Sequence, residues 1–151
     1  MRKLLLLSII CLASVQFVNA QQRVRSHAPA KVPQKTARLT GTYRNRSSEF
    51  KIQALGVNRL HVQFNGSYQY KVNGEMTANT GTADGTATVK YNVATFTPTN
   101  TQGCSITLTF VGQKLIAKQT GSDADCGFGH NVMADGTYIK RSNRSPKFDN
   151  Q

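Results

Sequence analysis

Residues 105–120 read SITLTFVGQKLIAKQT, and this stretch decides the fold. Apolar and polar residues alternate on both sides of Gly112-Gln113, as in two half-buried antiparallel strands. A two-residue type II′ turn at Gly112-Gln113 sets Phe110 opposite Leu115 and keeps the apolar side chains on one face. The same register pairs Leu108 with Ala117 and Ile106 with Gln119. The stretch therefore predicts a β-hairpin with one buried face.

The same period of two runs through residues 39–140, and no window of ten residues has a helical period. It predicts an all-β domain: an antiparallel meander of eight or nine strands that closes into a small barrel, with a two-layer β-sandwich as the alternative. The residues expected to point inward are Phe50, Ile52, Leu60, Val62, Phe64, Tyr68, Tyr70, Val89, Tyr91, Ile106, Leu108, Phe110 and Leu115.

Asp-Gly and Asn-Gly pairs suggest where the other turns lie. Asp84-Gly85 predicts a two-residue hairpin turn, because that register keeps the neighbouring apolar residues on one face. Two-residue turns at Asn65-Gly66 and Asn73-Gly74 would set Phe64 and Val72 opposite polar residues, so we expect three-residue loops with a glycine bulge there. The alternation changes phase between Val93 and Ala94, which predicts a bulge or a corner.

The first and last strands of this region have related sequences. Residues 41–47 read GTYRNRS and residues 136–142 read GTYIKRS. We interpret the match as two equivalent strands that lie side by side and close the sheet, in antiparallel pairing if the strand count is even. The Gly41-Thr42-Tyr43 opening of an eight-stranded meander resembles the Gly-x-Trp start of the lipocalin-like (calycin) barrels. That resemblance implies a barrel with a ligand in its interior, although Tyr43 replaces the tryptophan and the chain has no Trp.

The N-terminus has the pattern of a secretory signal. Arg2 and Lys3 precede the apolar run 4–18, and Val18-Asn19-Ala20 resembles a cleavage site, so we expect residues 1–20 to be removed on export to a secreted or periplasmic location. A retained membrane anchor is the alternative. The exported chain would have no transmembrane segment and two cysteines, Cys104 and Cys126, which we expect to form a disulfide.

Positive charge is concentrated outside the patterned region. The whole chain has 19 basic and 7 acidic residues, a net charge of +12. Residues 21–38 contain no acid and are expected to form a flexible basic arm, and residues 141–151 a basic C-terminal tail. The arm can attract the protein to an anionic surface or can simply favour solubility. Its basic residues are Arg23, Arg25, Lys31, Lys35 and Arg38. We do not expect nucleic acid as a partner, because no aromatic residue is interleaved with these bases.

Residues 123–131 concentrate polar groups in one loop. Asp123, Asp125 and His130 are candidates for binding a ligand, together with Phe128. The structural interpretation is a disulfide-pinned loop in which Phe128 plugs one end of the barrel. We assign no metal site, because a calcium loop would need further oxygen ligands and zinc would compete for Cys126. Tyr68, Tyr70 and Tyr91 complete the candidate ligand-binding residues.

The sequence lacks the motifs of common catalytic sites and implies no cofactor. We therefore expect a non-catalytic, exported binding module for a small apolar ligand or a component of the cell envelope. The alternative is a protein–protein interaction or inhibitor module that uses its loops and basic tails.

Overall fold

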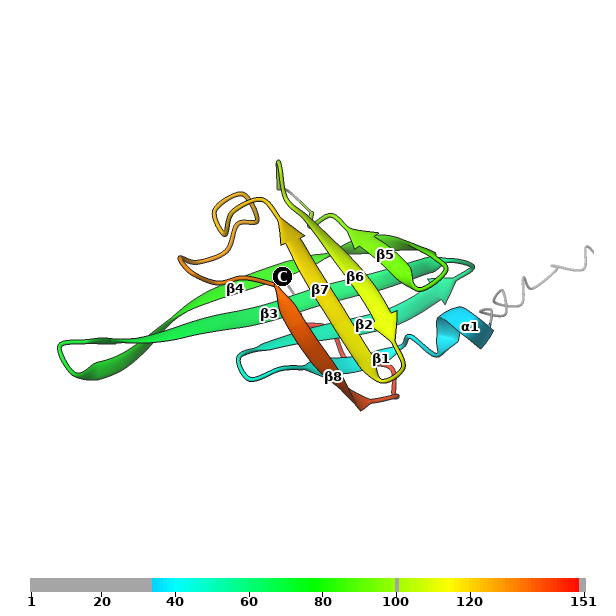
Figure 1. Ribbon diagram of the computed structural model, residues 1–151, viewed down its shortest axis with the longest axis horizontal. Coiled ribbons are helices and arrows are strands. Elements are labelled where there is room, and N and C mark those ends of the chain that lie inside the picture. Colours follow the sequence, from blue (N-terminus) through cyan, green and yellow to red (C-terminus); the bar gives the residue numbers. More distant parts are fainter. Residues whose placement is uncertain (1–33, 100, 150–151) are drawn as a thin grey trace, which may run out of the picture.

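Eight antiparallel strands follow one another around a closed barrel in a computed structural model that describes residues 34–99 and 101–149 (Figure 1). The predicted signal sequence and most of the predicted basic arm lie outside the described residues. The elements are α1 (Gln34–Ala37), β1 (Gly41–Arg44), β2 (Ser48–Gly56), β3 (Arg59–Val72), β4 (Glu75–Lys90), β5 (Val93–Phe96), β6 (Ser105–Val111), β7 (Lys114–Thr120) and β8 (Gly136–Ser142). None of the helical residues described here belongs to a segment long and apolar enough to cross a bilayer.

The predicted closure is confirmed, and the sandwich alternative is excluded. β1 pairs with β8 in antiparallel fashion, with Tyr43 opposite Lys140 and a register shift between Thr42 and Tyr43. Gly41 is required at this seam, because a Cβ there would lie 2.0 Å from the Ser142 carbonyl oxygen. The two related segments are therefore neighbouring strands.

The hairpin at Gly112-Gln113 is confirmed with the expected register, since Phe110 lies opposite Leu115 and Leu108 opposite Ala117. The phase change near Val93 has a simple cause. β4 and β5 are joined by a tight turn at Tyr91-Asn92, in which Lys90 lies opposite Val93 and Tyr91 has a φ of +59°.

The turns predicted at Asp84-Gly85 and Asn65-Gly66 are wrong. Both pairs lie inside long strands, with Asp84 opposite Gln63 and Gly66 opposite Gly81. Glycine occurs there because aromatic rings pack closely on the strand. A Cβ on Gly66 would lie 2.5 Å from the Phe64 ring, and one on Gly85 would lie 3.0 Å from the Phe96 ring.

The β3–β4 connection also differs from the prediction. Asn73-Gly74 forms a two-residue turn with positive φ at both residues and Val72 opposite Glu75. The rule that fixed the expected loop length assumed one buried face, but residues 67–80 form a hairpin that extends beyond the barrel (Figure 1). We call these residues the projecting hairpin. It places Tyr68 (42% exposed) and Tyr70 outside the core, and Tyr91 (77% exposed) lies in a turn, so the inward placement of all three was wrong.

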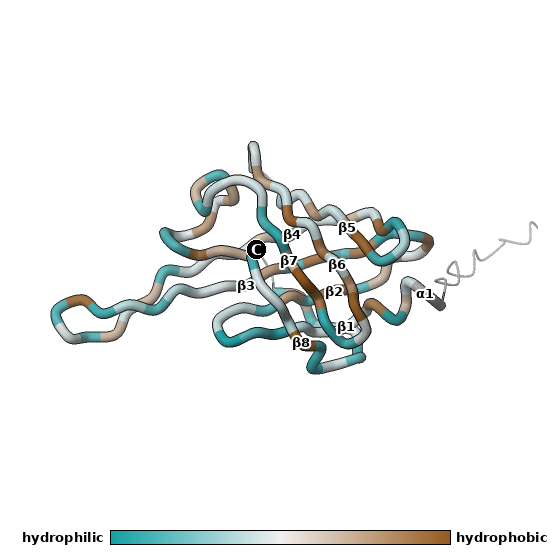
Figure 2. The backbone as a smooth tube through the Cα atoms, viewed as in Figure 1, coloured by the Kyte–Doolittle hydropathy of each residue, from teal (hydrophilic) through white to brown (hydrophobic). Residues whose placement is uncertain are grey.

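The other inward residues fill the barrel. Brown apolar segments recur along β6 and β7 (Figure 2). The largest buried side chains form an aromatic cluster, in which the Phe50 ring centroid lies 4.9 Å from those of both Phe64 and Tyr138. Phe64 in turn lies 5.1 Å from Phe128. The centre of the barrel is therefore packed with side chains.

The predicted disulfide is confirmed. Cys104 and Cys126 are bonded, with a Cα–Cα distance of 4.9 Å, and both are buried. The bond ties the β5–β6 loop to the loop of residues 121–135, which we call the plug loop.

Candidate functional site at the barrel mouth

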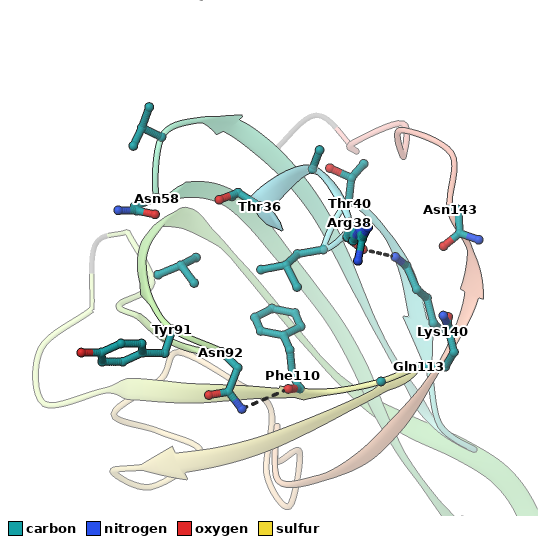
Figure 3. A pocket seen from close by; sticks show the side chains of 15 residues that line it. Thr36, Arg38, Thr40, Asn58, Tyr91, Asn92, Phe110, Gln113, Lys140 and Asn143 are labelled. Atoms are coloured by element: carbon teal, nitrogen blue, oxygen red, sulfur yellow. Dashed lines mark hydrogen bonds between the residues drawn. The ribbon is translucent and has the colours of Figure 1, made fainter. Parts of the chain in front are cut away.

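The two ends of the barrel differ. The plug loop covers one end, whereas a cavity of about 820 Å³ opens at the other, beside α1 (Figure 3). We call the second end the mouth and its cavity the mouth pocket. Alternate turns of a meander lie at the same end, so the β2–β3, β4–β5 and β6–β7 turns all form its rim. The volume falls in the range of about 300 to 1,000 Å³ that is typical of small-molecule sites.

Three apolar side chains provide the floor of the mouth pocket. Val89 and Phe110 are only 5% and 6% exposed, and both belong to barrel strands. Leu39, which follows α1, is half-buried and packs against the core. Phe110 also contacts Tyr43, with ring centroids 6.0 Å apart. A ligand that enters the mouth pocket therefore meets an apolar surface that is already packed from below.

Hydrogen bonds hold the rim in one shape. Each of its three turns accepts a backbone hydrogen bond from a neighbouring strand through a carbonyl oxygen. The Val89 N–H donates to Asn58, the Phe110 N–H to Asn92 and the Lys140 N–H to Gln113, each at 2.8 Å. Because the same device recurs at all three turns, the mouth pocket exists before any ligand binds.

α1 is held at the rim in a similar way. The Leu39 and Thr40 N–H groups donate to the Thr36 and Ala37 carbonyl oxygens at 3.0 and 3.1 Å. The Thr40 hydroxyl accepts a 3.0 Å hydrogen bond from the Ala54 N–H of β2. This helical turn occupies the end of the stretch expected to be a flexible arm, and Thr36–Thr40 line the mouth pocket.

One basic side chain lies between the apolar floor and solvent. Lys140 Nζ donates a 2.6 Å hydrogen bond to the Arg38 carbonyl oxygen and lies 5.4 Å from the centroid of the Tyr43 ring. Partial burial lowers the pKa of Lys140. Figure 3 shows Lys140 and Arg38 on the same side of the mouth pocket. These two residues give an otherwise apolar and amide-lined site a cationic side.

The structure does not bring the sequence-predicted ligand residues together. Tyr91 lines the mouth pocket at its edge. Tyr68 and Tyr70 stack on the projecting hairpin, with ring centroids 6.1 Å apart. The remaining candidates, Asp123, Asp125, Phe128 and His130, belong to the plug loop.

The acidic groups of the plug loop already have partners within it. Asp123 accepts hydrogen bonds from the Asn131 N–H at 2.6 Å and the Ala124 N–H at 2.8 Å, which lower the pKa of its carboxyl group. Asp125 accepts from the Ser122 N–H and hydroxyl at 2.7 and 2.8 Å, and its pKa is also lowered. These contacts are typical of a structural loop.

Phe128 points into the barrel from the plug loop. It is 7% exposed, and a Cβ on Gly81 of β4 would lie 2.8 Å from its ring. The Gly129 N–H donates to the Thr80 carbonyl oxygen at 2.9 Å, and Asn79 Nδ2 donates to the His130 carbonyl oxygen at 2.7 Å.

Within residues 34–99 and 101–149, no cluster of three or more His, Cys, Asp or Glu side chains is placed to hold a metal ion.

Of the basic residues assigned to anionic surfaces, Arg38 lies at the mouth pocket. Arg23, Arg25 and Lys31 lie outside the described residues, as does the side chain of Lys35. Sequence analysis missed Leu39, Lys140 and the amide-bearing residues of the rim. They come from separate turns and strands, so no motif marks them, and only the closure of the barrel brings them together.

The C-terminal segment, predicted as a basic tail, packs on the barrel through residues near its end. It lies against the outer face of β2 and β3, where the Phe148 ring stacks on His61 with centroids 3.9 Å apart. Gln63 exchanges two 3.0 Å hydrogen bonds with the Asp149 backbone, and Lys51 Nζ lies 2.6 Å from the Asp149 carboxylate. We call Phe148 and Asp149 the C-terminal clasp. It explains why Gln63, which points out of the barrel, is fully buried.

Comparison with known proteins finds no family model, curated protein or solved structure that matches this chain.

Proposed function

We propose that this protein is a non-catalytic binding protein that holds a small, mainly apolar ligand in the mouth pocket. The observation that carries the proposal is the preformed cavity of about 820 Å³, with the apolar floor of Leu39, Val89 and Phe110. Transfer of apolar surface from water to such a floor contributes about 25 cal/mol per Å². The packed barrel centre supports the mouth rather than the interior as the place for the ligand.

The polar groups around the floor suggest what the other end of the ligand is like. The cationic groups of Lys140 and Arg38 flank one side, and Asn58, Asn92 and Gln113 supply amides. This arrangement suits an apolar molecule with one polar or anionic end, because a few placed polar groups fix the orientation of a ligand in an apolar site. Components of a cell envelope include such molecules. An export signal and a lipocalin-like assignment remain part of the proposal, supported by residues 1–20 and by the eight-stranded meander.

A non-catalytic role is supported by the contacts of the histidine–carboxylate pair on the barrel wall, His61 and Asp84. His61 Nε2 lies 3.0 and 2.9 Å from the two carboxylate oxygens of Asp84, and the face of its ring is covered by Phe148. Its contacts therefore belong to the attachment of the C-terminal clasp. We place no substrate beside this pair.

The test uses a neutral apolar dye, N-phenyl-1-naphthylamine, and a matched pair of variants. Gln113→Trp introduces a bulky ring at the lining of the mouth pocket from an exposed turn, whereas Gln102→Trp makes the same change in the β5–β6 loop, away from the mouth. We expect the wild-type protein and Gln102→Trp to bind the dye equally, and Gln113→Trp to bind it at least 10-fold more weakly. Absence of dye binding to the wild-type protein, or equal binding by all three proteins, would refute the proposal.

The projecting hairpin favours a second function, contact with another protein. Tyr68, Val72 and Met76 are 42%, 48% and 60% exposed there, and a two-stranded ribbon alone is only marginally stable in water. If this is the main function, Tyr68→Ser with Tyr70→Ser should abolish capture of a partner from the native extract and leave dye binding intact. A Gln69→Ser control on the opposite face of the ribbon should retain the partner.

A further inference from the structure

The charges of the barrel are divided between its two ends. Six basic residues lie in or beside the rim of the mouth, and we call them the basic mouth: Arg38, Arg59, Lys90, Lys114, Lys140 and Arg141. Their common position at the mouth follows from the strand order. Each of them lies near the β2–β3, β4–β5 or β6–β7 turn, the start of β1 or the end of β8. Five of them are exposed, and Lys140 is half-buried.

No acidic residue lies in the three turns that form the rim of the mouth. The chain has seven acids, and all of them fall in the described residues. Glu49 lies at the start of β2 and Glu75 at the tip of the projecting hairpin, both at the opposite end. Of the remainder, three lie in the plug loop, Asp149 belongs to the C-terminal clasp, and Asp84 lies opposite Gln63, about 13 Å along the strand from Arg59. None of the described ion pairs involves a residue of the basic mouth, so the mouth presents a positive field.

Each turn of the rim also exposes an apolar side chain. Val57 of the β2–β3 turn is 66% exposed, Tyr91 of the β4–β5 turn 77%, and Val111 at the β6–β7 turn 51%. Figure 3 shows Tyr91 at the edge of the mouth pocket. Lys90 Nζ lies 5.9 Å from the Tyr91 ring centroid, so a cation and an amphipathic ring occur together at that tip. Three apolar tips at one end of a barrel are not explained by core packing.

We infer that the protein docks on an anionic lipid bilayer through its mouth, with the basic mouth facing the headgroups and Val57, Tyr91 and Val111 entering the interface. A soluble polyanion would satisfy the charges but would leave the three apolar tips in water, whereas a bilayer interface accepts both. The projecting hairpin and the plug loop would then face away from the bilayer. The mouth pocket would open toward the lipid, so an apolar ligand can pass between them without crossing water.

This inference does not depend on the proposed function. Docking can hold even if the mouth pocket stays empty, and dye can bind in the mouth pocket of a protein that never meets a bilayer. The vesicle-binding test therefore measures docking directly and changes only residues outside the pocket lining.

The test compares two triple variants of the exported protein. Intact mass identifies the first residue of each preparation, and only protein that lacks the apolar run 4–18 is used. The mouth variant is Arg59→Gln, Lys90→Gln and Lys114→Gln. The matched control is Arg46→Gln, Lys71→Gln and Lys118→Gln, which removes the same charge from the other parts of the barrel. The probes are vesicles of phosphatidylcholine with 30% phosphatidylglycerol and vesicles of phosphatidylcholine alone. All variants keep residues 21–35, so the bases there contribute equally.

Each basic side chain near an anionic surface contributes about 1 kcal/mol, so we expect the mouth variant to bind the anionic vesicles about 100-fold more weakly than the wild-type protein. The control should stay within about 5-fold of it. Equal losses in the two variants, or equal binding of wild-type protein to both kinds of vesicle, would overturn the inference.

A second measurement keeps the inference testable if a triple variant folds poorly. Because the chain has no Trp, a single tryptophan reports on one position. Val57→Trp should shift its emission to the blue with anionic vesicles only, and Val72→Trp on the projecting hairpin should not shift. A shift of Val72→Trp, or no shift of Val57→Trp while the protein sediments with the vesicles, would show that another face or a headgroup-only contact is responsible and would overturn docking through the mouth.

Discussion

Tyr43 and Tyr138 make the same hydrogen bond from equivalent places in the two related strands. The Tyr43 hydroxyl donates to the Leu39 carbonyl oxygen and the Tyr138 hydroxyl to the Ala134 carbonyl oxygen, both at 2.9 Å and both four residues back along the chain. Both rings are buried, and each follows a glycine with positive φ by two residues. The repeated sequence is therefore a repeated structural device that fixes the entry of β1 and of β8 at the seam.

The first prediction concerns this pair. Loss of either hydroxyl leaves a carbonyl oxygen without its donor, which typically costs about 1 to 3 kcal/mol. The Tyr138 bond is fully buried and the Tyr43 bond only partly, so Tyr138→Phe should lower the free energy of unfolding by about 2 kcal/mol and Tyr43→Phe by about 1 kcal/mol. Urea unfolding measures both. Tyr91→Phe, in an exposed turn, is the control and should leave the free energy of unfolding unchanged. Equal effects of all three changes would contradict the role of the Tyr43 and Tyr138 hydroxyl groups at the seam.

The second prediction is a loss of stability in alkali. Burial raises the pKa of Tyr138 to about 12 from its usual value of 10.0. A raised pKa in the folded state means that the stability is fully present below pH 10 and is lost as the pH rises toward 12. A tenfold change in proton affinity corresponds to about 1.4 kcal/mol, so ionisation of this group removes about 3 kcal/mol between those pH values. Urea unfolding at pH 9 and pH 11.5 should show a smaller difference for Tyr138→Phe than for the wild-type protein, and an unchanged difference would be inconsistent with a buried, neutral Tyr138.

The third prediction tests the close packing of Phe128 on β4. Gly81→Ala places a methyl group 2.8 Å from the Phe128 ring and should lower the free energy of unfolding by about 1 to 3 kcal/mol, because the core is overpacked. Phe128→Leu in the same chain shortens the opposing side chain and should restore part of the loss. Chemical denaturation of the single and double variants measures this coupling. Additive losses would show that the two residues do not meet.

The fourth prediction concerns the C-terminal clasp. The Phe148 ring covers His61, and an aromatic contact of this kind contributes about 1 kcal/mol, so Phe148→Ala should lower the free energy of unfolding by about that amount. The same change should speed amide hydrogen exchange in β2 and β3 beneath the clasp. Lys147→Ala, the neighbouring exposed position, should leave both measurements unchanged. If Phe148→Ala leaves amide hydrogen exchange in β2 and β3 unaltered, the clasp does not stabilise these strands.

The hairpin at Gly112-Gln113 was predictable because strong apolar residues flank a turn that permits only one useful register. The strand positions of Gly66 and Gly85 were not predictable, since a glycine under an aromatic ring and a glycine in a turn look alike in the sequence. Within the long strands β3 and β4, the Phe64 ring packs on Gly66 and the Phe96 ring on Gly85.

The candidate site was less accessible to sequence analysis than the fold. A cluster of polar residues in the plug loop looks like a binding site, but Asp123 and Asp125 hold the loop itself. The mouth pocket instead combines Leu39, Val89, Phe110 and Lys140, which are far apart in the chain. Only barrel closure makes them neighbours, and no short-range pattern in the sequence marks which side chains it brings together.

The most direct test of the account is to map a bound apolar probe onto the backbone by NMR. We predict that N-phenyl-1-naphthylamine shifts the amide resonances of Leu39, Val89, Phe110 and Gln113 at the mouth, and leaves those of residues 123–131 at the other end unchanged. Shifts confined to residues 123–131, or no shifts at saturating probe, would contradict the mouth pocket as the binding site.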